Sequence, residues 1–336
     1  MTLSLTDRIA ELATTWGPYG REAGVAALLS EWLTPLNVTL KQDALGSLLA
    51  TRPGKPGGKK VLVLAHMDTV GAVVLNVTEK GLLQVAPVGE LAVHNAIGQT
   101  VLFGSGALGI LQHEPVEDVK ELDWKKAFVD LGASTKEAAL QQVKLGDIGV
   151  IDAPVYERSE GLLTGPHLDN RAACALMLHV AELLDDSPNE VTFAFTAQGK
   201  VNSRGAAPAT WHAQPDLAIV LGLTNSSDIP RGAKTEVKLG AGPALRLKDG
   251  GWVIRAELAD DVRAKAENLG VPLQSEVLAG VQSEAGAVAS ATQGVPTVML
   301  TLPARYRGTA TETVALADLE ATAKLLLQLA ADVTVS

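Results

Sequence analysis

The stretch from Val61 to Gly71 constrains the fold of this chain more than any other. It reads VLVLAHMDTVG, in which a run of apolar residues is followed by His66 and Asp68. Such a short apolar run, preceded by the glycines and lysines of residues 57–60, predicts a strand buried on both faces of a sheet. Functional side chains of open α/β sheets lie beyond the carboxyl ends of the strands. The sequence therefore places a histidine and an acid there, in the pattern of a metal ligand and its acidic neighbour.

The composition predicts a globular protein with a large core. The chain has 336 residues, of which 47% are hydrophobic and 20% charged, so two domains are expected. The formal net charge of −10 argues against a nucleic-acid partner. We find neither a signal-peptide core nor an apolar run near the ~20 residues of a membrane span, and Cys174 is the single cysteine. We therefore expect a soluble cytoplasmic protein that does not bind membranes.

Hydrophobic periodicity changes along the chain and predicts an inserted β-rich segment. Residues 4–35 have helical spacing, and residues 37–41 and 47–51 alternate like strands. From about residue 72 to 163, short β-like runs alternate with glycine and proline, and helical spacing is confined to 115–122 and 134–142. Helices and strands then alternate, with helices at 172–184, 205–212, 258–269, 283–291 and 316–331 and strands at 191–197, 217–223 and 296–302. This order predicts a mostly parallel sheet.

Five motifs occur in an order that identifies a family. They are AHMD at 65–68, VDLGAS at 129–134, LDNRA at 168–172, Gln198 with RGA at 204–206, and GVPT at 294–297 with PARY at 303–306. Together they resemble the glutamyl or tetrahedral aminopeptidases, the forty-second family of metallopeptidases. The resemblance covers nearly the whole chain. It implies a phosphorylase/hydrolase-like zinc-aminopeptidase α/β domain from residues 1–71 and 164–336, with an inserted β-rich, barrel-like dimerisation domain at 72–163. It also implies a homo-oligomer, either a dimer or a dodecamer of dimers.

The resemblance further implies where a metal centre would lie. Active members of the family bind two divalent metals, zinc or cobalt, through five side chains and use a separate glutamate as general base. Carried over by motif, the ligands that this sequence keeps are His66 and Asp169, with Asp68 as the acid behind the histidine. The remaining functional positions hold different residues: Lys200, Gly222 and Gly308 stand at ligand positions, and Gly199 stands at the position of the base.

These substitutions predict a family member without a cofactor and without catalytic residues. One imidazole and one carboxylate cannot balance two divalent ions, and an ammonium at a ligand position would repel them. We expect Lys200 to form a salt bridge with Asp169 instead, because the ammonium would compensate an otherwise lone buried carboxylate. A scaffold, regulatory or binding role would then replace peptidase activity, either in a homo-oligomer or in a hetero-oligomer with an active relative.

The residues also leave alternatives open. An active metal-dependent aminopeptidase could use a rearranged site, and one metal could bind to His66, His167 and Asp169, because HLD at 167–169 repeats the spacing of HMD at 66–68. Asp169 could instead cap a helix. We interpret Glu284 as an acid at a helix N-terminus and Cys174 as a core residue.

Overall fold

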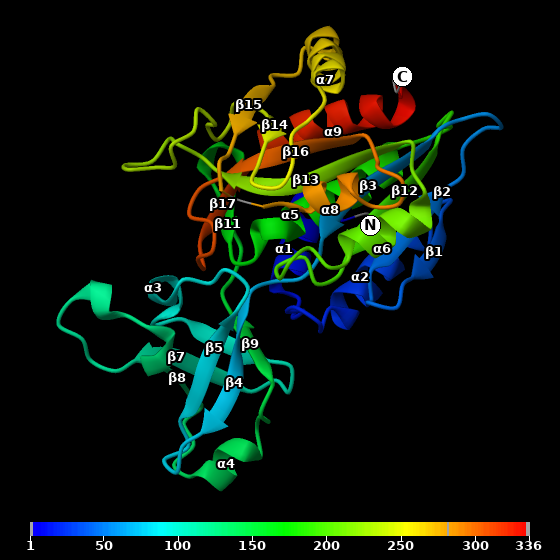
Figure 1. The fold of residues 1–336 in the computed structure, drawn as a ribbon. Helices are drawn as coiled ribbons and strands as arrows, with labels where there is room; N and C mark the ends of the chain where they lie inside the picture. The colour runs from blue at the N-terminus through cyan, green and yellow to red at the C-terminus, as the bar shows by residue number, and fades with distance from the viewer. Residues whose placement is uncertain (1–2, 281, 334–336) are drawn as a thin grey trace.

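A mixed β-sheet runs through the larger part of the molecule (Figure 1). The computed structural model describes residues 3–280 and 282–333. Within them the sheet has eight strands, in the order β1-β2-β12-β3-β13-β16-β14-β15. Their bounds are Thr39–Gln42 for β1, Leu48–Arg52 for β2, Glu190–Thr196 for β12, Lys60–His66 for β3, Leu217–Asn225 for β13, Thr297–Ala304 for β16, Ala244–Lys248 for β14 and Gln274–Val277 for β15.

The centre of the sheet is parallel and its flanks are not. Strands β12, β3, β13 and β16 pair in parallel, as their apolar runs predict. Strand β2 pairs antiparallel with both β1 and β12, and β14 pairs antiparallel with β16. Because the four central strands run in the same direction, their carboxyl ends meet at one edge, where the candidate site lies.

Helices cover both faces of this sheet. One face packs against α1 (Leu5–Thr14), α2 (Ala23–Leu33), α5 (Leu168–Leu183), α7 (Ala256–Leu269) and α9 (Leu316–Ala331), and the other packs against α6 (Ala206–Ala213) and α8 (Glu284–Ala289). Side chains of β3 divide between the two cores: Val61 and Val63 join the first, while Leu62 and Leu64 join the second. The strand is therefore buried on both faces, as its apolar run predicts. Among the described residues, no helix combines the length and apolarity needed to cross a bilayer.

The segment between β3 and β11 forms a closed barrel beside the sheet (Figure 1). The strand order is β4-β5-β8-β7-β6-β9, with bounds Gly71–Val77, Leu83–Val88, Ala127–Asp130, Leu108–His113, Thr100–Phe103 and Ile148–Ile151. Two short helices, α3 (Val93–Ala96) and α4 (Lys136–Leu140), flank it. A further sheet pairs β10 (Tyr156–Arg158), β11 (Leu162–Gly165) and β17 (Glu312–Ala315).

The helix predicted at 115–122 is wrong. The structure has only a 3₁₀ turn there, Val119–Glu121, followed by another at Trp124–Lys126. Neither turn has a buried residue, so no apolar face was available to stabilise a longer helix.

Candidate functional site

The parallel strands bring their ends together around the start of α5. Thr196, the last residue of β12, pairs with His66, the last residue of β3. Gly222 of β13 lies level with His66, because Val220 pairs with Leu64 two residues earlier. The amide of Asn170 donates to the carbonyl of Leu221 at 2.9 Å, which fixes the first turn of α5 against β13. Asp169 is therefore held at the same edge as His66 and Gly222.

Asp169 lies between two cationic side chains. Its Oδ2 is 2.8 Å from Nζ of Lys200 and 2.7 Å from Nη2 of Arg307. Burial disfavours the carboxylate, but the charges of Arg307, Lys200 and His66 outweigh burial and hold the pKa of Asp169 far below its ordinary value. The group therefore stays ionised. The N-cap position of α5 belongs to His167, and the carboxylate of Asp169 binds Lys200 and Arg307 instead of serving as the helix cap that the sequence left open.

His66 and Asp68 form a second pair beside it. Nδ1 of His66 is 3.3 Å from Oδ1 of Asp68, and Nε2 is 3.9 Å from Oδ1 of Asp169. The carboxylate of Asp68 also accepts the backbone N–H groups of Gly199 at 2.7 Å and Lys200 at 2.8 Å. Burial and the charge of Lys200 lower the pKa of His66, but Asp68 and Glu284 raise it further, so the net shift is upward. Asp68 thus orients both the imidazole and the loop that carries Lys200.

The three glycines of the site have different surroundings. A Cβ built on Gly199 would lie 2.2 Å from Cβ of His66, so this backbone excludes any side chain at the position expected for a general base. A Cβ on Gly222 would lie 3.1 Å from Cε of Met299, which fills the adjoining space. Gly308 has φ +75°, a conformation that favours glycine, and a Cβ there would meet nothing closer than 3.9 Å.

Two residues of this cluster, Arg307 and Glu312, are not among those proposed from the sequence. Glu312 is buried and accepts the N–H of Asp169 at 2.8 Å and the N–H of Gly308 at 2.7 Å. Burial and the neighbouring charge of Asp169 raise the pKa of Glu312 to about 7. The sequence signal for Arg307 is its place next to Gly308, which the family resemblance assigns as a ligand position; Glu312 has no comparable signal.

The other residues singled out from the sequence have separate roles. Nε2 of His167 lies 2.8 Å from the carbonyl oxygen of Ile151 at the end of β9, and burial together with the charge of Arg171 lowers the pKa of His167 to about 4. Glu284 begins α8 and accepts from the hydroxyl of Thr196 at 2.7 Å. Burial raises the pKa of Cys174 to about 12, which leaves the thiol neutral within the core.

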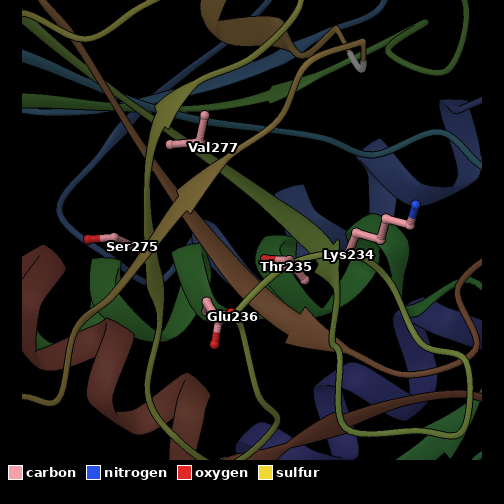
Figure 2. Close-up of a pocket in the computed structure, with 5 residues that line it drawn as sticks. All are labelled: Lys234, Thr235, Glu236, Ser275 and Val277. Atoms are coloured by element: carbon pink, nitrogen blue, oxygen red, sulfur yellow. The ribbon is translucent and has the colours of Figure 1, made fainter.

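The chemistry of the cluster is therefore that of ion pairs and hydrogen bonds. Across residues 3–280 and 282–333, no three His, Cys, Asp or Glu side chains come together in a group that could hold a metal ion. A hollow in the surface lies elsewhere, between the loop of Lys234, Thr235 and Glu236 and the edge strand residues Ser275 and Val277 (Figure 2). None of these five residues belongs to the cluster around Asp169.

Comparison with known proteins decides the family. The sequence matches the M42 glutamyl aminopeptidase family over residues 46–325, which is most of the chain. The chain belongs to this family. Among its family relatives, a protein of Acetivibrio thermocellus that bears an aminopeptidase name is 33% identical over 313 residues, covering 93% of this chain and 94% of the relative. The lysyl aminopeptidase of Pyrococcus furiosus is 29% identical over 315 residues, covering 90% and 89%.

Solved structures of similar peptidases share the whole fold. The TET1 peptidase of Pyrococcus horikoshii, which can assemble into a tetrahedron or a large octahedral shell, superposes with a TM-score of 0.87 at 27% identity over 98% of this chain and 100% of that chain. An aminopeptidase of the archaeon Desulfurococcus kamchatkensis gives a TM-score of 0.93 at 29% identity over 97% and 94%. The predicted α/β aminopeptidase fold with a barrel-like insertion is thus confirmed.

Proposed function

We propose that this M42-family protein acts without the two-metal aminopeptidase centre of its active relatives and serves a scaffold, regulatory or binding role. The observation that carries the proposal is the pair of cations on Asp169. Lys200 and Arg307 both contact Oδ2, one of the two carboxylate oxygens with which Asp169 would bridge metal ions. They supply the positive charge that two bridged metal ions would otherwise provide to the carboxylate of Asp169.

The donors of this site do not fit two divalent ions. His66 and Asp169 are the family ligand positions that keep a ligand side chain, whereas structural and catalytic zinc sites use about three or four protein ligands each. An ammonium about 4 Å from a divalent ion would be repelled by about 8 kcal/mol at an effective dielectric near 20, twice the value for unit charges. We therefore derive no catalytic step through a metal here.

The position of the general base supports the same proposal. Gly199 has no carboxylate, and the close approach of His66 leaves no room for one on this backbone. General-base catalysis typically contributes a factor of ~10²–10⁴ in rate. An active aminopeptidase with a rearranged metal site is the second candidate, and membership of the M42 family is the observation that favours it.

Metal analysis and an activity assay on the same sample test the proposal. The full chain would be treated with EDTA, exposed to zinc or cobalt, freed of excess ion, and then analysed for metal per chain and for release of amino acids from aminoacyl p-nitroanilides. An active M42 peptidase taken through the same steps is the control. We expect much less than one ion per chain and no metal-dependent release. Close to two ions per chain with release of the N-terminal residue would establish the second candidate.

We also propose that the chain forms a homo-oligomer through residues 72–163, acting as a dimerisation domain distinct from the α/β domain of 1–71 and 164–336. Leu108 and Ile110 of β7 are 54% and 49% exposed, although they alternate with buried neighbours. Such apolar side chains on a barrel exterior favour burial against another chain. The tetrahedral or octahedral assembly of the Pyrococcus horikoshii TET1 peptidase, and a related TET1 structure with a dodecamer in the asymmetric unit, support a dimer that builds a dodecamer, and pairing with an active relative is the competing arrangement. A cytoplasmic location completes the proposal.

A further inference from the structure

Strand β15 is an edge strand with an open outer side. The order of the large sheet ends in β14-β15, so β14 is the one strand beside β15 among the described residues. The N–H groups of Gln274 and Leu278 donate to carbonyls in and next to β14. Backbone groups alternate between the two sides of a strand, so those of Ser275 and Val277 face outward. Both residues are exposed, Val277 by 61%. Such an edge is a template for a further strand.

Two hollows in the surface follow this edge. One, of about 510 Å³, lies between Ser275, Val277 and the loop residues 234–236 (Figure 2). The other, of about 230 Å³, lies between Ser275 and side chains of α7 and of the turn before β15: Arg263, Ala266, Glu267, Val271 and Leu273. Because Ser275 borders both hollows, they form one trough alongside β15.

The loop beside the larger hollow is held at its base. The N–H and the hydroxyl of Ser227 donate to the carbonyl of Val237 at 2.8 Å and 3.0 Å. The amide of Gln274 on β15 pairs with the N–H and the carbonyl of Lys238 at 2.8 Å and 3.0 Å. Residues 228–236 therefore project from a fixed base (yellow-green in Figure 1). This loop and α7 are the two walls of the trough, which leave room for a single extended chain between them. A second copy that paired through its own β15 would bring its own loop and α7 against these walls.

We propose that the trough binds an extended segment of a partner protein, which adds to β15 as a further strand of the sheet. Main-chain hydrogen bonds to Ser275 and Val277 supply the affinity, and side chains at alternate positions of the segment enter the hollows. The smaller hollow has Ala266 and Val271 as its buried floor, which suits an aliphatic side chain. The inference goes beyond the proposed function, because no residue of the trough belongs to the cluster around Asp169.

The charges along the trough favour a segment without net charge. Lys234 and Glu236 line the larger hollow. Arg263, which also pairs with Asp260, and Glu267 line the smaller one. Since neither sign dominates, backbone pairing and the aliphatic side chain select the segment.

Titration calorimetry on the full chain tests the trough with a neutral probe, the peptide Ser-Thr-Val-Thr-Val-Thr-Ser with an acetylated N-terminus and an amidated C-terminus. Its alternating residues favour the extended conformation. We expect saturable binding, with slower hydrogen exchange at the amides of Ser275 and Val277. Two further peptides carry N-methyl groups, one on both valines and the other on the second and third threonines. Only one of these peptides should lose binding, because alternate amides of a strand face the same side.

A matched pair of variants tests the protein side of the contact. Ser275→Pro and Ser275→Ala both lose the hydroxyl, but only the proline also removes the outward N–H, and it leaves the bonds to β14 in place. We expect Ser275→Pro to bind the peptide at least about fivefold more weakly than Ser275→Ala, as for the loss of a backbone hydrogen bond. Circular dichroism establishes that both variants are folded, and the N-methylated peptides test the same contact on the unaltered chain.

Four results would overturn the inference. They are no saturable binding at millimolar peptide, equal affinities of the two Ser275 variants, equal effects of the two methylation patterns, and slowed exchange confined to other parts of the chain. Light scattering distinguishes a contact between copies: Ser275→Pro should leave the mass of the oligomer unchanged. A smaller mass would show that β15 joins two copies of this chain and would also overturn the inference.

Discussion

Removing Lys200 should reveal how strongly its ion pair with Asp169 stabilises the fold. The side chains are only 13% and 9% exposed, and their charged atoms are 2.8 Å apart. At an effective dielectric near 20, the attraction across this distance is about 6 kcal/mol. Desolvation of both groups offsets part of it, and Arg307 still contacts Asp169 when Lys200 is lost. We therefore expect Lys200→Met to lower the free energy of unfolding by about 2–3 kcal/mol, less than the 3–5 kcal/mol for an isolated buried charge.

A double-mutant cycle isolates the pair from other effects of each substitution. Lys200→Met, Asp169→Asn and the double variant would be unfolded in urea, with tryptophan fluorescence as the signal. We expect a coupling energy of about 2 kcal/mol. A matched cycle on Lys55 and Asp186 is the control, because that pair has the same 2.8 Å separation but is 56% and 79% exposed.

The expected coupling for the exposed pair is about 0.2–1 kcal/mol. If both cycles gave the same small value, burial would not strengthen the pair around Asp169. Lys200 would then not compensate a buried carboxylate at Asp169.

Three further predictions concern other parts of the structure. Gly199→Ala should destabilise the fold by about 1–3 kcal/mol, since its Cβ would overlap His66, and urea unfolding measures this. The free energy of unfolding should fall as pH rises from 4.5, the ordinary pKa of Glu312, to about 7, because the folded state keeps a proton that the unfolded chain releases. Urea midpoints measured across this range should show the fall, and Glu312→Gln should make it smaller. Leu108→Glu combined with Ile110→Glu should reduce the oligomer in light scattering with no change in circular dichroism.

Each of these has a result that contradicts it. If Gly199→Ala were as stable as the wild type, the loop of residues 199–200 would shift easily to admit the methyl group. Gly308→Ala is the control, because a positive φ and not crowding disfavours a side chain at that position. A urea midpoint that rises from pH 5 to 7 would contradict the raised pKa of Glu312. An unchanged mass for the β7 double variant would exclude that face of the barrel as the contact surface.

The central strands and helices are predictable because their signals are local. The apolar run before His66 predicts a buried strand, and the helical spacing of apolar residues at 316–331 predicts a helix with one buried face. The structure has β3 and α9 at these places. The strands β14, β15 and β17, at or next to the edges of their sheets, were not predicted. They are short, and β15 alternates intermediate, exposed and buried residues without a continuous apolar run. These strands form because they pair with neighbouring strands, and no local pattern in the sequence indicates that pairing.

The site is only partly predictable for a similar reason. Lys200 is predictable as a partner of Asp169, because a side chain at a ligand position faces the carboxylate that would share the metal. Arg307 reaches the same oxygen from a turn 138 residues away in the chain, next to Gly308, to which the family resemblance assigns a ligand position. The crowding of Gly199 by His66 is likewise a backbone distance that no spacing of residues indicates.

The barrel holds the site from two sides. Residues 67–70 lead from β3 directly into β4, and within them Asp68 binds the loop of Gly199 and Lys200. On the return path, the carbonyl of Ile151 at the end of β9 holds His167, two residues before Asp169. Because both connections run from the barrel to the site, a tilt of the barrel would move the Asp68 loop and His167 together. Docking of a neighbouring molecule on the barrel would therefore act on the distance between Asp68 and Asp169, which would link assembly mechanically to the geometry of the ion pairs around Asp169.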